Sequence, residues 1–216
     1  HWCDLSQRCH TQRPACEAVP PADHPAALSN PIAPNASLNY GGDAAGLICG
    51  YLLGTDTPPQ EVDSAQAAQW LADLQAGAAS SGQFLWLHFN LSHAQAVRWM
   101  ERHAHLPEAF FDALKDRSVS TRIERDDDTL IAVLNDAHFD FAFEPSDIAT
   151  LWTSVAPHLM VTGRTRPLRS VDVLRTAVRT GNAPCSSVAL LAELMRTQAS
   201  GLVDICLLYT SDAADE

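Results

Sequence analysis

The sequence has little positive charge and no long hydrophobic run. Its 216 residues carry 14 basic and 26 acidic side chains, a net charge of −12, which disfavours binding to a nucleic-acid backbone. No apolar run reaches the roughly 18–20 residues that span a bilayer, so we expect the chain as it stands not to be embedded in a membrane. With 46% apolar and 19% charged residues, the composition is that of one globular domain.

The two ends of the sequence differ from its middle. The first forty residues show no helical or strand period and are rich in proline, serine, asparagine and alanine, so we predict a disordered leader over 1–40. This leader has no basic segment before an apolar one, which excludes a signal peptide. From Cys206 to Glu216 the sequence resembles a translated sequencing adapter. We therefore predict a non-native tail over 200–216, which makes 41–199 a piece of a longer protein.

Within 41–199 the chain remains acidic and has little cysteine. Its 19 acidic and 12 basic side chains give a net charge of −7, and its cysteines are Cys49 and Cys185. Two cysteines in apolar surroundings are typical of a reducing compartment. The leader holds a further group of candidate zinc ligands, whose spacing matches no common finger or ribbon: Cys3, Cys9, His10 and Cys16. We interpret this group as incidental.

Residues 41–199 alternate between strand and helix patterns. Apolar runs and period-two alternation predict strands over 45–53, 84–89, 119–123, 130–134, 139–143, 148–155 and 159–162. The run over 84–89 is nearly all apolar, so we expect a central strand that is covered on both faces. Apolar residues at helical spacing predict helices that begin near Thr57, Ser92, Pro107, Pro167 and Val188.

Two helix boundaries rest on specific signals. Thr57-Pro58-Pro59-Gln60 predicts the cap of the first helix, which ends at Gly77, and Ser92-X-X-Gln95 predicts the start of the second. The last helix has no stop signal in its sequence. The order of the elements predicts a single α/β domain, in which a mixed, partly antiparallel sheet is covered by helices in an α/β/α arrangement.

A search for catalytic and metal-binding motifs finds no phosphate loop, no Gly-X-Ser-X-Gly elbow and no His-Glu-X-X-His pair. Four histidines fall within eighteen residues and are candidates for metal ligands or acid–base groups: His88, His93, His103 and His105. No nearby cysteine or pair of carboxylates completes a tetrahedral set, which favours a structural interpretation. An enzyme that uses His88, His93 or Cys185 is one hypothesis, but we predict no enzyme, no catalytic or cofactor-binding residue, and no assignable metal site.

Two charged clusters leave alternatives open. The three acids over 126–128 suit a solvated turn better than a divalent-cation site, since adjacent side chains in a hairpin point in different directions. Five arginines share sixteen residues with a single acid, Asp172: Arg164, Arg166, Arg169, Arg175 and Arg179. They are consistent with an anion site, with a contact to an acidic neighbouring subunit, or with the solvated face of a helix.

A series of short motifs runs in order through residues 47–199. They are Trp86-Leu-His-Phe-Asn-Leu-Ser-His93, Arg98-Trp-Met100, Leu106-Pro-Glu108, Asp112-Ala-Leu114, Thr121-Arg-Ile-Glu124, Thr129-Leu-Ile-Ala-Val-Leu134, Leu159-Met-Val-Thr-Gly-Arg-Thr-Arg166, Ser170-Val-Asp-Val-Leu174 and Thr180-Gly-Asn-Ala-Pro184. Together they resemble the cytoplasmic domain of ZntB-like zinc transporters, a branch of the CorA family of metal-ion transporters. The proline that usually precedes the arginine at Thr121-Arg122 is absent here.

The resemblance implies a specific biological role. Such proteins are homopentamers whose α/β/α domains form a cytoplasmic funnel above a pore in the inner membrane. A long helix from each domain leads into two C-terminal transmembrane helices, and a Gly-Met-Asn motif lies at the pore mouth. The resemblance implies Zn²⁺ as the transported ion, with Mg²⁺ or another divalent cation as the alternative, no bound cofactor and no nucleic-acid partner. The alternative function is a free-standing soluble domain of the same fold that senses metal or acts as a scaffold.

Overall fold

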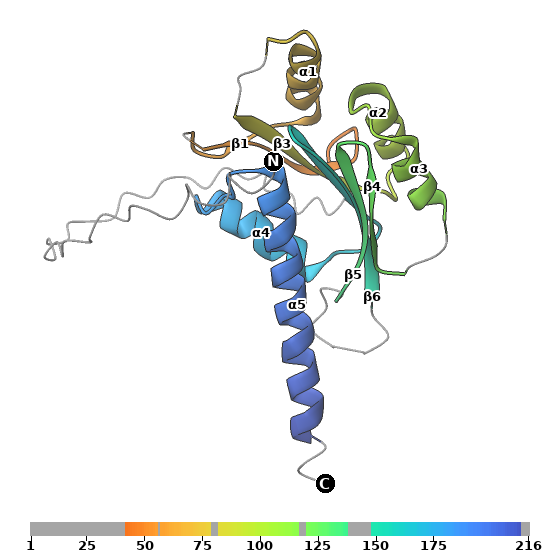
Figure 1. Cartoon of the computed structure of the whole chain (residues 1–216), viewed down its shortest axis with the longest axis vertical. Helices are drawn as coiled ribbons and strands as arrows, with labels where there is room; N and C mark the ends of the chain where they lie inside the picture. Colours follow the sequence, from red (N-terminus) through yellow and green to blue (C-terminus); the bar gives the residue numbers. More distant parts are fainter. Residues whose placement is uncertain (1–41, 56, 79–81, 117–119, 138–147, 213–216) are drawn as a thin grey trace, which may run out of the picture. The chain divides into compact units, whose positions relative to one another are not determined.

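The computed structural model describes residues 42–55, 57–78, 82–116, 120–137 and 148–212. The predicted leader and the predicted strand over 139–143 lie outside these residues. The strands form one seven-stranded sheet in the order β2-β1-β3-β7-β6-β5-β4 (Figure 1). Their bounds are β1 Leu47–Gly54, β2 Gln60–Glu61, β3 Gln83–Asn90, β4 Arg122–Asp126, β5 Thr129–Ala137, β6 Ile148–Ala156 and β7 Leu159–Arg164.

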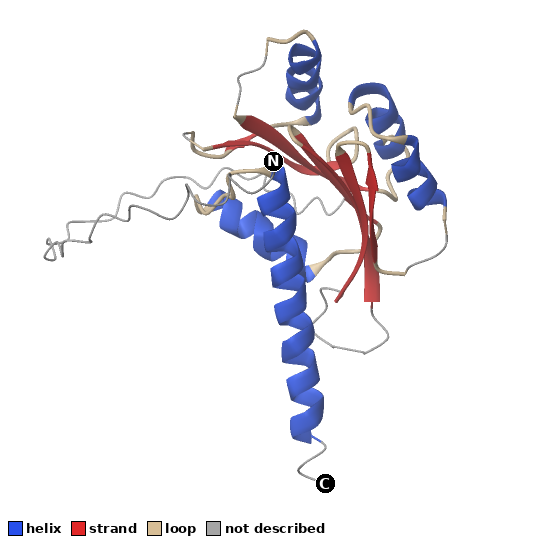
Figure 2. Ribbon diagram, in the orientation of Figure 1, coloured by secondary structure: helices blue, strands red, loops and turns tan. Residues whose placement is uncertain are grey.

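Helices cover both faces of the sheet (Figure 2). One layer contains α1 Ser64–Gln75, α2 Ala96–His103 and α3 Glu108–Lys115, and the other contains α4 Arg169–Arg179 and α5 Ser187–Asp212. All described strand pairs are antiparallel except β3 with β7, which is parallel. The predicted α/β/α arrangement with a mixed sheet is therefore confirmed.

Strand β3 lies in the interior of the sheet, between β1 and β7. Its side chains alternate between the two faces, and Leu85, Leu87 and Phe89 pack against the layer of α1, α2 and α3. Phe84 and Trp86 pack on the opposite face against α4 and α5. All five side chains are fully or almost fully buried. This arrangement explains why the strand reads as a continuous apolar run in the sequence.

The prediction that a helix begins at Thr57-Pro58-Pro59-Gln60 was wrong. Residues Gln60 and Glu61 form β2 instead, and the backbone N–H of Val62 donates to the carbonyl of Gly50 at 2.9 Å. Helix α1 begins only at Ser64, where Asp63 and Gln66 form a reciprocal capping box. Two consecutive prolines favour an extended chain at the residue before each ring, which suits a short edge strand.

The predicted start of the second helix was also displaced. Residues 92–95 form turns rather than helix, because the side-chain oxygen of Asn90 accepts the backbone N–H of Ser92 at 3.0 Å. Helix α2 therefore begins at Ala96. The remaining helices agree with their predicted positions, and α5 continues to Asp212, so the adapter origin of 200–216 stays a prediction.

A pair of buried threonines lies on the face of the sheet that α4 and α5 cover. Thr153 of β6 and Thr162 of β7 are direct cross-strand neighbours, and neither is exposed to solvent. The Thr162 hydroxyl donates to the carbonyl of Leu87 and accepts from the Trp86 indole, at 3.2 and 3.1 Å. Among the described residues, the Thr153 hydroxyl has no partner. A buried hydroxyl without a partner lowers stability, because on folding it loses its hydrogen bonds to water and forms none within the protein.

The same substitution at these two neighbours should therefore have opposite effects. We expect Thr153→Val to raise the free energy of unfolding by about 1 kcal/mol, because it removes an unpaired hydroxyl at nearly constant shape. Thr162→Val should lower it by about 2 kcal/mol, because three groups lose their partner. Urea unfolding of both variants measures the difference, and a loss of stability in Thr153→Val would contradict this assignment.

Candidate functional site

A cluster of buried polar side chains spans the junction between β3 and β7. His88 lies opposite Thr162 in the parallel register, and Arg164 ends β7 two residues later. The exposed fractions of His88 and Arg164 are only 1% and 6%. A histidine and an arginine buried at this depth need hydrogen-bond partners, and the cluster supplies them.

The hydrogen bonds determine which nitrogen of the His88 ring carries a proton. The Nε of Arg164 donates to Nε2 of His88 at 3.1 Å, so Nε2 carries no proton. The other nitrogen, Nδ1, then holds the proton and donates to the Thr162 hydroxyl at 2.9 Å. Both ring nitrogens are thus occupied, and His88 is a neutral structural histidine rather than a metal ligand or a general base.

The surroundings of His88 oppose its protonation. Burial lowers the pKa of His88 well below 6.5, and the positive charges of Arg164 and Arg175 lower it further. A protonated ring would also place a second N–H against the guanidinium of Arg164. Since the folded chain excludes a proton that the unfolded chain binds, stability is lost as the pH falls below the unfolded value of 6.5.

We therefore expect the free energy of unfolding to fall by about 1 to 2 kcal/mol between pH 6.5 and about pH 5, where few carboxylates titrate. The variant His88→Gln retains an acceptor for Arg164 and a donor for Thr162 but does not titrate. It should remove most of this pH dependence. Chemical unfolding at several pH values measures the free energy of unfolding of both proteins. The same change of this free energy with pH in the unaltered protein and in His88→Gln would contradict the role of His88.

The structure separates the other candidate histidines from His88. His93 lies half-buried in the turn before α2, and its ring packs over Gly46, whose φ of +80° and close contact suit only glycine. The His103 ring packs at a tilt against Trp99, with the ring centroids 5.1 Å apart, and His105 is exposed beyond the end of α2. Within the described ranges, no three histidine, cysteine or acidic side chains are placed to hold a metal ion.

The cysteines do not complete a catalytic arrangement with His88. Cys49 is buried in β1, and burial raises the pKa of its thiol to about 12, so it stays protonated. Cys185 is exposed in the segment between α4 and α5. The side chains in hydrogen-bond contact with His88 are those of Thr162 and Arg164. The enzyme hypothesis thus finds no support in the geometry of its three candidate residues.

A pocket of about 340 Å³ lies beside β1 and β2. Three carboxylates line it, but Asp63 caps α1 and Asp43 organises the loop before β1. Asp43 accepts the backbone N–H groups of Ala45, Leu47 and Ser64 at 2.9 to 3.1 Å. Partial burial acts to raise the pKa of Asp43, but these bonds and one from the Ser64 side chain hold it below its usual value. Two of the three carboxylates are therefore structural.

The two charged clusters that the sequence singled out have different outcomes. Asp127 and Asp128 form the predicted turn of the β4–β5 hairpin, where Asp127 has a φ of +48°, and Asp126 is the last residue of β4. The five arginines do not form one site. Arg164 is buried against His88, Arg175 is half-buried, and the others are exposed: Arg166, Arg169 and Arg179.

Sequence reasoning missed the partners that make His88 structural. Thr162 and Arg164 lie 74 and 76 positions after His88 in the sequence and meet it only because β3 pairs with β7. The alternation of Met160, Thr162 and Arg164 in an otherwise apolar strand was the available signal, since it places two polar groups on one buried face. The role of Asp43 was also missed, although Asp-X-X-Gly is a common loop pattern.

Residues 81–207 match the model of a protein family described as "CorA-like Mg2+ transporter protein". A zinc transport protein, ZntB of Yersinia enterocolitica, is 26% identical over 138 residues, which are 64% of this chain and 41% of that protein. The chain therefore spans about two fifths of the length of that relative. In the part of the chain that the structure describes, no helix is both long enough and apolar enough to cross a bilayer.

Solved structures share the fold. Full-length CmaX is similar with a TM-score of 0.66 at 23% identity, over 81% of this chain and 51% of that chain. The cytoplasmic domain of ZntB from Vibrio parahaemolyticus is similar with a TM-score of 0.59 at 19% identity, over 78% of this chain and 63% of that chain. At these identities the similarity establishes the arrangement of helices and strands.

Proposed function

Because the chain belongs to the CorA-like Mg2+ transporter protein family, we propose that it forms the cytoplasmic domain of a transporter for divalent cations. The observation that carries this proposal is the extent of the family match. It begins just before β3, includes the β3–β7 junction and α4, and ends within α5. The resemblance stated from the sequence motifs is thereby confirmed at the level of the family.

The geometry suits a domain that holds a long helix. Helix α5 has 26 residues, of which 187–199, about 20 Å of helix, precede the predicted non-native tail. Its first turns are fixed to the sheet by Leu190, Leu191 and Leu194, which are buried in the core. Figure 1 shows the rest of the helix extending beyond α4 and past the lower end of the sheet. A helix anchored at one end transmits a displacement of the domain along its axis, since α-helices are stiff on this length scale.

We propose Zn²⁺ as the transported ion. The relative from Yersinia enterocolitica is named a zinc transport protein, although it is only 26% identical. The net charge of −7 over 41–199 favours the accumulation of any divalent cation near the domain. Mg²⁺ is the competing substrate, because the family takes its name from it. The complete protein in this proposal is a homopentamer in the inner membrane, with this domain on the cytoplasmic side.

The proposal is tested with the complete protein encoded by the genomic reading frame. We expect that frame to continue after residue 199 through a long helix into two apolar segments of about 20 residues each. Reconstituted into liposomes that hold a zinc-sensitive dye, the complete protein should admit Zn²⁺, and more slowly Mg²⁺ in a parallel assay with a magnesium dye. Empty liposomes and liposomes mixed with the present chain are the controls and should show no flux.

Two results would contradict the proposal. A reading frame that ends without apolar segments would favour a free-standing domain of the same fold. A complete protein that inserts in liposomes but admits no divalent cation would exclude the transport function. Faster flux of Mg²⁺ than of Zn²⁺ would keep the family function and overturn the choice of ion.

A further inference from the structure

The outward side of α4 carries positive charge that forms no ion pair within the described part of the chain. Arg169 and Arg179 are exposed near the two ends of the helix, and Arg166 is exposed just before it. We call these three residues the arginine strip. None of them forms an ion pair with a described residue, whereas Lys115, Arg122, Arg125 and Arg196 each do.

An apolar side chain lies within the arginine strip. Val173 is 48% exposed and is one of the few large apolar residues on the described surface. It follows Arg169 by one helical turn, while Ser170, Val171, Leu174 and Val178 point to the core. Singly exposed apolar residues are common on protein surfaces, so Val173 adds only a small apolar area beside Arg169.

The charge of the strip contrasts with the rest of the domain. The three arginines of the strip carry three positive charges. The remainder of 41–199 holds 19 acidic and 9 basic side chains, a net charge of −10. Two copies of this domain therefore repel each other in most orientations, except where the strip of one meets an acidic surface of the other.

Helix α3 provides an acidic surface of matching length. Glu108, Asp112 and Asp116 follow one another at intervals of four residues and are all exposed, while Phe110 and Ala113 point inward. We call these three residues the acidic strip. Its ends are about 12 Å apart along the helix axis, and those of Arg169 and Arg179 about 15 Å. The acidic strip follows one side of α3, whereas Arg169 and Arg179 lie about 80° apart around the axis of α4, with the half-buried Asp172 between them.

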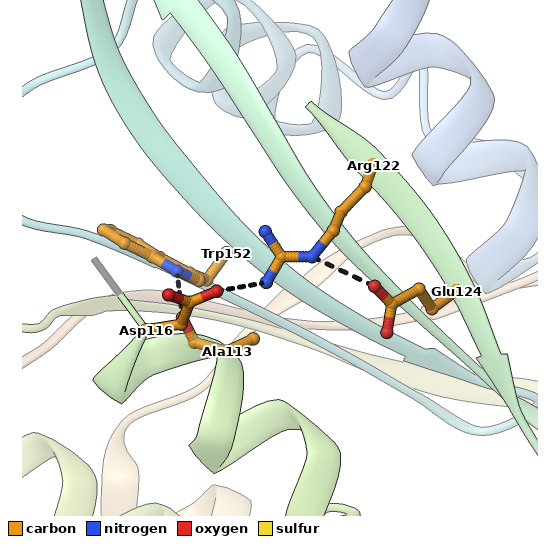
Figure 3. Close-up of polar contacts among 5 residues, drawn as sticks. All are labelled: Ala113, Asp116, Arg122, Glu124 and Trp152. Atoms are coloured by element: carbon orange, nitrogen blue, oxygen red, sulfur yellow. Dashed lines mark hydrogen bonds and ion pairs between the residues drawn. The ribbon is translucent and has the colours of Figure 1, made fainter. Parts of the chain in front are cut away.

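The acidic strip is held rigidly against the sheet. The Trp152 indole of β6 donates to the carbonyl of Ala113 at 2.9 Å, which fixes the end of α3. Arg122 of β4 reaches Asp116 at 3.4 Å and Glu124 at 3.0 Å (Figure 3). These pairs and the one between Lys115 and Asp112 are exposed on at least one side, so they are weak and exchange readily for a better partner.

We propose that the arginine strip on α4 docks on the acidic strip on α3 of a second copy of this chain. The two helices belong to opposite layers of the sheet, so one copy cannot satisfy its own strips (Figure 2). The contact joins two different surfaces and leaves one free strip on each outer copy, so further copies can add until a ring closes or a filament grows. The inference rests on the proposed function only in taking the domain to be one subunit of a homo-oligomer.

A charge-reversal experiment on the purified chain tests the contact. Sedimentation velocity should show self-association that weakens between about 50 and about 500 mM salt, because exposed charges are screened over this range. The double variant Arg169→Glu with Arg179→Glu should raise the dissociation constant for self-association about tenfold or more. Arg98→Glu with Arg102→Glu, on the exposed face of α2, makes the same change of charge and should leave association unchanged.

Mixing two variants identifies the acidic partner. Glu108→Lys with Asp112→Lys should by itself fail to associate, as should the α4 double variant. An equimolar mixture of the two should associate again, because the reversed strips attract each other and the unaltered strips still match. Circular dichroism of each variant confirms that the fold is kept.

The outcomes separate this proposal from its competitors. No association of the unaltered chain, or association that the α4 variant leaves intact, would overturn it. Failure of the mixture to associate would overturn the choice of α3. Loss of binding to vesicles of anionic phospholipid in the α4 variant, without any self-association, would assign the arginine strip to lipid instead. None of these measurements depends on ion flux, so a failure of the transport proposal is recognised separately.

Discussion

Strands β3 and β7 lie about 75 residues apart in the sequence, and their parallel pairing joins the two halves of the sheet. On one side β3 pairs with β1, and on the other β7 continues into the antiparallel strands β6, β5 and β4. Each half of the sheet contributes side chains to both apolar cores, so neither core is complete unless β3 pairs with β7. Parallel strands require a long crossover, and this crossover contains α2, α3 and three strands.

The polar cluster of His88, Thr162 and Arg164 makes this junction specific. A strand that is apolar on both faces can pair in more than one register. The His88 imidazole, in contrast, forms its hydrogen bonds to Thr162 and Arg164 in one register only. Arg164 is also the last residue of β7, immediately before the segment that leads into α4. The junction therefore sets where α4 and α5 leave the sheet, and with them the basic outward face of α4 and the direction of the long helix. Buried charge is costly, and its retention at this position is consistent with a role in fixing one arrangement.

Much of this fold is predictable from local pattern. The apolar run over 84–89, the stripe of Val171, Leu174 and Val178, and the predicted strand over 130–134 each correspond to an element that the structure contains. The errors occurred where local signals compete, since Pro58-Pro59 suits both a helix start and an extended edge strand.

The sites were less predictable than the fold. His88 appeared as one of four candidate ligands, and only its contacts with residues of β7 show that both ring nitrogens are already used. The five arginines likewise read as one cluster, although Arg164 is internal and the arginine strip is external.

Amide hydrogen exchange on the purified chain tests most directly whether the β3–β7 junction supports the rest of the domain. The account predicts that the amides of 85–90 and 159–164 exchange slowest, with a free energy of opening equal to that of global unfolding. The amides of α1 and of the β4–β5 hairpin should exchange faster, through local opening. If β3 and β7 exchange as fast as the β4–β5 hairpin while the remaining strands stay protected, the junction is not the support of the sheet and the account is wrong.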